Sequence, residues 1–133
     1  MRSVKINQDD LGKIRDLYES VMANACHGLF FKEGGILGKE IAAAALQDKD
    51  KFFETAAELL KDRGWVESVE FSEDGVKVKG SFEATGREGP TCHRLRGIIR
   101  ELYERKSSTR VNCQEEECAS TGKDYCRFLV KAA

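Results

Sequence analysis

The sequence predicts an α+β fold, in which helices pack on an antiparallel sheet of about four strands. Apolar residues recur at helical spacing through the first half of the chain, from about residue 8 to residue 63. From residue 65 onward the apolar residues alternate with polar ones, as in strands, except in one later helical run. Segregated helices and strands are typical of α+β domains. With 133 residues, we expect a single domain over residues 1–133.

Two helices are predicted before residue 50. The first covers about residues 8–28, with Asn7 or Asp9 available as its N-cap. We expect a break at Gly34-Gly35, because glycine is a poor helix former. A second helix then covers residues 36–46, where four consecutive alanines permit close helix packing.

The next predicted elements are a helix over residues 50–63, stopped by Gly64, and a β-hairpin. Residues 65–71 alternate as in a strand, and Asp74-Gly75 is a hairpin turn signal. The returning strand contains Val76 and Val78 and continues to Phe82, loosened at Gly80. These residues should form the first pair of strands in the sheet.

The last predicted elements are a helix and a second strand pair. Pro90-Thr91 opens the helix, which runs to about residue 106 and holds Cys92 in its first turn. Residues 109–116 and 125–130 read as strands joined by a turn around Gly122. This arrangement brings the start of the helix and the last hairpin into one fold.

Composition excludes several function classes. The net charge is −1, with 22 basic and 23 acidic residues, so bulk charge favours neither nucleic acid nor an anionic membrane. The basic residues of the late helix alternate with Glu101 and Glu104 and read as a solvated face: Arg94, Arg96, Arg100, Arg105 and Lys106. The chain has no apolar membrane span and no apolar leader, so we expect a cytoplasmic protein.

The cysteine pattern indicates reduced thiols and a candidate metal site. Five cysteines without a secretory segment argue against a disulfide framework. Cys118 and Cys126 flank Gly122, and three glutamates, residues 115–117, precede the first thiol. Thiolates and a carboxylate are zinc ligands, although these thiols also fit plain core packing. We interpret Cys26 and Cys113 as packing residues.

The residues alone leave two choices of thiol or imidazole and two choices of carboxylate open. Cys92 at a helix start is the best candidate, because the helix dipole stabilises a thiolate, and His93 is the alternative. Glu115 and Cys118 point to opposite faces of a straight strand, so both reach one ion only if the strand bends between them. Glu117 is the alternative carboxylate, and spacing does not decide between the two.

The sequence resembles a known family, the 4-vinyl reductase domain, which is related to the sensing domains of phenol-responsive bacterial activators. The resemblance covers roughly residues 28–130. Its specific piece is Glu115-x-x-Cys118-x-x-x-Gly122-x-x-x-Cys126 followed by Arg127-Phe128. The supporting pieces are residues 34–38, Gly64-Trp65 and residues 89–92.

The resemblance implies a ligand set and a role. Zinc-binding members use a cysteine opening the late helix, a glutamate three residues before a cysteine, that cysteine, and a cysteine eight residues further on. Carried onto this sequence, the ligands are Cys92, Glu115, Cys118 and Cys126. Three thiolates and one carboxylate close a four-coordinate shell, so the implied zinc is structural.

The resemblance also implies a sensor or carrier domain that binds an apolar, aromatic or lipid-like molecule between helices and sheet, and acts through a partner protein or as a homodimer. The alternatives are a role in tetrapyrrole vinyl-group reduction and a zinc-stapled interaction module. We expect no catalysis, because no nucleotide-binding glycine loop or redox centre is evident. Large side chains are candidate ligand contacts, with one histidine as a polar handle: His27, Phe30, Phe31, Trp65, Phe82 and Tyr103.

Overall fold

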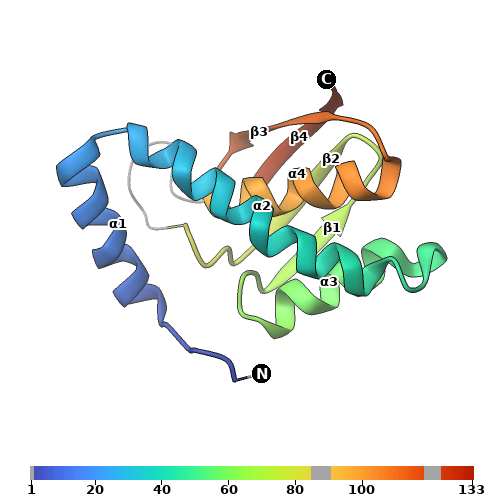
Figure 1. The fold of residues 1–133 in the computed structure, drawn as a ribbon, viewed down its shortest axis with the longest axis horizontal. Coiled ribbons are helices and arrows are strands. Elements are labelled where there is room, and N and C mark those ends of the chain that lie inside the picture. The colour runs from blue at the N-terminus through green and yellow to red at the C-terminus, as the bar shows by residue number, and fades with distance from the viewer. Residues whose placement is uncertain (1, 85–90, 119–123) are drawn as a thin grey trace.

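A computed structural model describes residues 2–84, 91–118 and 124–133. The predicted α+β class is confirmed, since these residues form four α-helices and one antiparallel sheet with the strand order β1-β2-β4-β3 (Figure 1). The helices are α1 (Gln8–Met22), α2 (Ala25–Ala45), α3 (Phe52–Asp62) and α4 (His93–Ser107), with a short 3-10 helix η1 (Lys49–Lys51) before α3. The strands are β1 (Ser68–Phe71), β2 (Gly75–Lys79), β3 (Val111–Glu117) and β4 (Cys126–Ala132).

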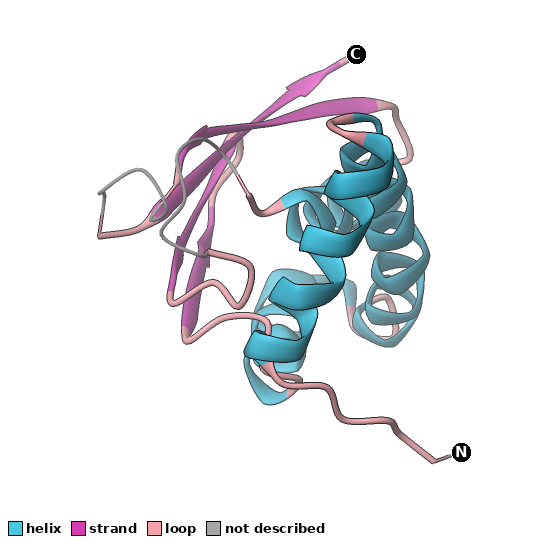
Figure 2. Cartoon of the chain, turned by 90° about the vertical axis from the view of Figure 1, so that its left-hand side faces the viewer, coloured by secondary structure: helices cyan, strands magenta, loops and turns pink. Residues whose placement is uncertain are grey.

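The molecule has a helical layer and a sheet layer. Figure 2 shows the helices gathered on one side of the sheet. The inward residues of β2 and β4, such as Val78 and Phe128, are fully buried beneath the apolar side of α4. That side consists of Leu95, Ile98, Ile99 and Leu102, all fully buried. Helix α4 is therefore the element that joins the two layers.

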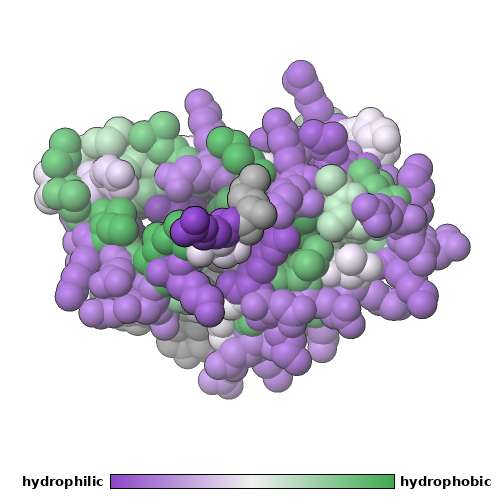
Figure 3. All heavy atoms as spheres, turned by 60° about the horizontal axis from the view of Figure 1, so that its bottom comes forward, coloured by the Kyte–Doolittle hydropathy of each residue, from purple (hydrophilic) through white to green (hydrophobic). Residues whose placement is uncertain are grey.

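The predicted boundary between the first two helices is wrong. α1 ends at Met22, because Ala23 adopts a positive φ of 52°, and α2 already begins at Ala25. No glycine or proline marks this turn, so the apolar spacing alone suggested a continuous helix. Apolar side chains gather on the surface at the end of the molecule where α1 and α2 meet (Figure 3).

The predicted break at Gly34-Gly35 is also wrong, because α2 runs through both residues. A Cβ at Gly34 would collide with the backbone carbonyl of Arg94, and one at Gly97 would collide with that of Phe31. Helices α2 and α4 thus cross with their backbones in contact, and this pair has the most extensive packing in the fold. Glycine is used here to allow close approach, not to end a helix.

The third predicted helix and the first hairpin are present with shifted ends. Asp48 caps η1 through the Asp50 amide, and Gly64 adopts φ 84° after α3, as a stop signal should. β1 and β2 pair antiparallel, with Phe71 opposite Val76. β2 ends at Lys79, so the expected continuation to Phe82 is wrong: Gly80 takes φ 64° and turns the chain away.

The late helix and the last strand pair form as predicted, within a few residues. Cys92 is the N-cap of α4, and β3 pairs antiparallel with β4. The register shifts between Glu115 and Glu117, which is a β-bulge. The predicted turn at Gly122 and the predicted helix opening at Pro90 lie outside the described residues.

Candidate metal centre

The α4 start is fixed by two carboxylates from elsewhere in the chain. The Cys92 amide donates to Glu115 Oε1 (3.2 Å), and the Arg94 and Leu95 amides donate to the two carboxylate oxygens of Glu83 (3.3 and 2.8 Å). The first turn of a helix has free N–H groups and a positive dipole end, so carboxylates stabilise it. These bonds hold Cys92 in place against the sheet.

The β-bulge supplies the bend that the sequence required. Glu115 lies opposite Phe128 and Glu117 opposite Arg127, so one extra residue separates them on β3. A bulge re-aims the following side chains. As a result, Glu115 and Cys118 can point to the same side, where Cys126 begins β4.

Three thiols and one carboxylate meet at this point. The donor atoms of Cys92, Glu115, Cys118 and Cys126 all lie within 4.8 Å of one another, and all three cysteines are buried. The Sγ atoms form a triangle with sides of 3.9 Å (Cys92–Cys118), 3.7 Å (Cys92–Cys126) and 3.8 Å (Cys118–Cys126). Within the described residues this is the single group of donors that could hold a metal ion.

The size of the triangle matches a tetrahedral zinc site. Zinc–thiolate bonds of about 2.3 Å at tetrahedral angles separate two sulfur atoms by about 3.8 Å. A disulfide would need sulfur atoms about 2.05 Å apart, and all five cysteines are free. The residues present therefore fit a soft, four-coordinate divalent ion.

The pKa values in the cluster and one carboxylate oxygen that is unpaired within the described part of the chain also favour a bound cation. Burial, followed by the neighbouring Cys118, raises the pKa of Glu115 to about 8. The pKa of the Cys92 thiol is raised by its hydrogen bonds to Cys118 and Cys126, and further by burial. Glu115 Oε2 is buried and has no hydrogen-bond partner among the described residues. A divalent cation would satisfy this oxygen and stabilise the anionic forms of all four groups.

The alternative donors lie outside the cluster. The His93 ring stacks on the His27 ring, with centroids 4.1 Å apart, and His27 Nε2 is 2.8 Å from Glu19 Oε2. Burial, followed by the nearby His27, lowers the pKa of His93 to about 4. Glu117 is also absent from the group of close donors.

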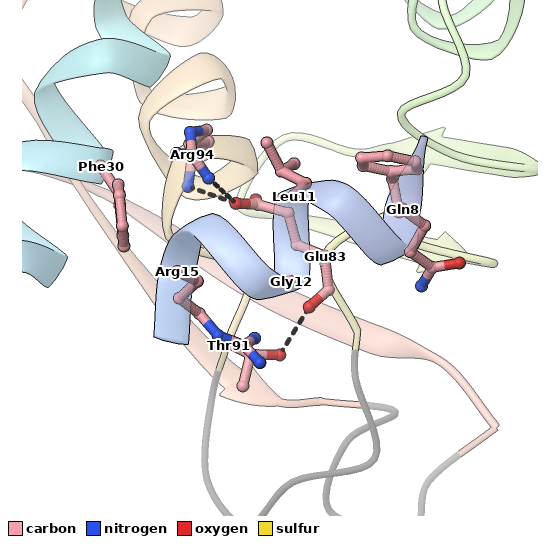
Figure 4. A pocket seen from close by; sticks show the side chains of 9 residues that line it. Gln8, Leu11, Gly12, Arg15, Phe30, Glu83, Thr91 and Arg94 are labelled. Carbon is pink, nitrogen blue, oxygen red and sulfur yellow. Dashed lines mark hydrogen bonds and ion pairs between the residues drawn. The ribbon is translucent and has the colours of Figure 1, made fainter. Parts of the chain in front are cut away.

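The six predicted ligand contacts do not share one cavity. Phe30 and Phe82 line a hollow of about 20 Å³ beneath α1 (Figure 4). Trp65 contacts Phe82 edge-on, with centroids 6.2 Å apart, and Tyr103 lies elsewhere, donating its hydroxyl to the Ser72 carbonyl at 2.6 Å. His27 belongs to the histidine stack described above. A space of about 20 Å³ is close to the size of one water molecule.

Phe31 instead lines an open groove of about 700 Å³ along the edge strand β3. The Arg96 guanidinium lies 4.0 Å from the Phe31 ring centroid and the Arg100 guanidinium 5.5 Å from it. Arg96 also donates to the Cys113 carbonyl at 3.3 Å, and Arg100 pairs with Glu104 at 3.4 Å. The remaining cations of the groove are Arg110 and Lys131.

The expectation of a solvated basic face on α4 is wrong for Arg94. Its side chain is buried and pairs with Glu33 (3.1 Å) and with Glu83 (3.6 Å), as the dashed lines to Glu83 in Figure 4 indicate. Sequence reasoning also missed Arg96 and Arg100 as groove residues. Their i, i+4 spacing places both on one side of the helix, but no sequence signal pairs them with Phe31.

Comparison with known proteins identifies relatives of this fold. Residues 74–132 match the family model described as the V4R domain. Two of the four quoted motif pieces lie inside this match, residues 89–92 and the piece beginning at Glu115. The uncharacterized protein MJ0150 of Methanocaldococcus jannaschii is 32% identical over 110 residues, a match that covers 77% of this chain and 63% of that protein. The chain therefore matches less than two thirds of that relative's length.

Solved structures show the same fold at low sequence identity. The phenol-responsive sensory domain of the transcription activator PoxR, solved with phenol, matches with a TM-score of 0.85 and 20% identity, over 99% of this chain and 77% of that one. A vinyl-4-reductase family protein from Methanocaldococcus jannaschii matches with a TM-score of 0.72 and 22% identity, over 99% of this chain and 85% of that one. A trafficking protein particle complex subunit 3 from Naegleria fowleri, covalently bound to palmitic acid, matches with a TM-score of 0.57 and 16% identity, over 92% of this chain and 88% of that one. None of the helices in the described residues is long and apolar enough to cross a membrane.

Proposed function

Because residues 74–132 match the V4R domain family model, we propose that this chain is a small-molecule-binding domain, a sensor or carrier, stabilised by one structural zinc ion. The observation that supports the zinc is the sulfur triangle of Cys92, Cys118 and Cys126 with the Glu115 carboxylate beside it. Its output would pass through a partner protein or through a dimer.

The four residues would have a structural role toward the ion. Three thiolates and one carboxylate fill a tetrahedral shell and leave no position for a reacting water. Cys92 belongs to the start of α4, Glu115 to β3 and Cys126 to β4, so bound metal would tie the helical layer to the last hairpin. Metal binding of this kind is coupled to folding, because the unfolded chain has no preformed site.

The ligand proposal is supported by the relatives and by the groove. The PoxR domain was solved with phenol and the trafficking subunit with palmitic acid, so this fold accommodates small aromatic and lipid molecules in other proteins. In this chain the groove beside Phe31 has the volume of a small-molecule site, whereas the hollow beside Phe30 does not. The cations around Phe31 favour an aromatic or lipid-like ligand that carries a negative charge.

Native mass spectrometry of protein purified without added metal tests the zinc and reports any co-purified ligand. We expect one zinc per chain. Cys118→Ser and Cys126→Ser should each lose the metal and much of the stability, because each removes a ligand from the shell. Cys26→Ser is the matched control, since Cys26 is equally buried but lies in the first turn of α2 and donates a hydrogen bond from its thiol to the Ala23 carbonyl. Unchanged metal content in both ligand variants would exclude this site.

A further inference from the structure

The surface of α1 and α2 carries an unusual share of exposed apolar side chains. Of the nine large apolar residues that are exposed in the described part of the chain, seven lie on these two helices: Leu17, Tyr18, Val21, Met22, Leu29, Ile36 and Leu37. Val21 is 75% exposed and Ile36 70%. Figure 3 shows apolar surface gathered at the end of the molecule where α1 and α2 meet. Contiguous exposed apolar surface is typical of a protein interface.

On α2 the exposed residues form one stripe, which we call the α2 outer stripe. Leu29, Ile36 and Ala43 are exposed and follow one another at seven-residue intervals, which places them on one side of the helix. Lys32, Glu33, Lys39 and Glu40 are exposed beside them. The other side of α2, with Gly34 and Gly38, is buried against α4. The outer stripe is therefore free to contact a second molecule.

The charges of the α2 outer stripe are complementary to themselves. In an antiparallel pair of α2 helices crossing at Ile36, residues equally far from Ile36 face one another. Lys32 then faces Glu40 of the partner subunit, and Glu33 faces Lys39 of the partner subunit. By contrast, a parallel pair would set Lys32 against the same lysine of its partner. Opposite charges across an interface favour the antiparallel arrangement and fix its register.

The existing ion pairs leave the lysines available. Glu33 pairs with Arg94 at 3.1 Å and Glu40 with Arg63 at 3.0 Å, whereas Lys32 and Lys39 form no ion pair within the described residues. The net charge of −1 gives two copies little long-range repulsion.

We infer that two copies of this chain pair through antiparallel α2 helices that cross at Ile36, with the exposed α1 side chains lengthening the contact. This inference rests on the dimer named in the proposed function and gives it a surface.

Charge-swapped variants of the full chain test this surface. Lys32→Glu with Lys39→Glu makes the stripe acidic, and Glu33→Lys with Glu40→Lys makes it basic. Each variant alone should dissociate, with a dimer dissociation constant raised on the order of a hundredfold, because like charges then face one another. An equimolar mixture of the two should recover the dimer. Ile36→Ser should weaken the dimer without any change of charge, and Lys61→Glu with Lys79→Glu is the matched control on other exposed lysines.

The readouts are the mass from multi-angle light scattering and the helix content from circular dichroism. A wild-type dimer, dissociated variants of unchanged helix content and a mixed dimer support the inference. A wild-type protein with the mass of one chain at high micromolar concentration overturns both the dimer and its surface. A wild-type dimer that persists in both charge variants and in Ile36→Ser overturns the surface and leaves the dimer in place.

Discussion

At the scale of single residues, Glu83 shows how a buried carboxylate fixes the position of a candidate ligand. It accepts from two amides in the first turn of α4 and contacts Arg94, and burial, the largest effect, raises its pKa to about 7. Between about pH 4.5 and 7 the folded protein keeps the proton that the unfolded chain has lost. The contribution of Glu83 to the free energy of unfolding is therefore complete at low pH and is lost as the pH rises through 7.

Glu83→Gln should flatten this part of the pH dependence. Between pH 5 and pH 8 the wild type should lose on the order of 3 kcal/mol of unfolding free energy relative to the variant, since one pKa unit corresponds to about 1.4 kcal/mol. Urea unfolding at several pH values measures the difference. The exposed Glu54→Gln is the control for loss of one carboxylate. Parallel pH profiles for wild type and Glu83→Gln would contradict the assignment.

At the scale of elements, the crossing of α2 and α4 depends on glycines that a sequence pattern cannot interpret. Gly34→Ala should destabilise the fold by about 3 kcal/mol or more, because the added Cβ meets the Arg94 backbone, which cannot move aside. Gly35→Ala should instead stabilise α2 by roughly 0.5–1 kcal/mol, since nothing lies near its Cβ and alanine is the better helix former. Thermal or urea unfolding of both variants checks the contrast, and equal effects at the two sites would contradict the backbone contact.

Elements also show how far the sequence could predict this molecule. Strong local signals gave the helices and strands, such as the apolar alternation of β2 and the stop at Gly64. The turn at Ala23 carries no such signal, and the meaning of Gly34 depends on a helix about sixty residues away. The full set of four donors follows only from the family resemblance, because spacing alone leaves Glu117 and His93 as alternatives. The β-bulge that aligns Glu115 with Cys118 is expected from the sequence only as a bend. The position of a pocket depends on packing between the layers, which the sequence pattern does not show. The six ligand candidates therefore lie apart in the structure, and the sequence did not indicate Arg96 and Arg100 as groove residues.

At the scale of the whole molecule, the ligand proposal concerns a surface built from four elements. α2 supplies Phe31, α4 supplies Arg96 and Arg100, β3 supplies the edge along which the groove runs, and β4 supplies Lys131. Arg96 is half-buried, and burial lowers its pKa below the ordinary value, so an anion beside it would offset a desolvation cost that the guanidinium already bears. Charge should therefore decide which aromatic molecules bind.

A thermal-shift comparison of matched compounds tests this reasoning on the metal-loaded protein. Benzoate and medium-chain fatty acids should raise the melting temperature more than benzyl alcohol or the corresponding fatty alcohols. A ligand that binds only the native state raises the free energy of unfolding by about 2.7 kcal/mol when its concentration is a hundredfold above Kd. Arg96→Met keeps much of the side-chain volume and should reduce the preference for the charged member of each pair, whereas Arg105→Met, at an exposed arginine at the far end of α4, should leave this preference unchanged. If neutral compounds bind equally well, the ligand does not use these cations.

Turnover of a bound compound, lost on substitution of His27 or His93, would favour an enzyme instead. If no compound shifts the melting temperature, the metal-stabilised fold is better explained as an interaction module.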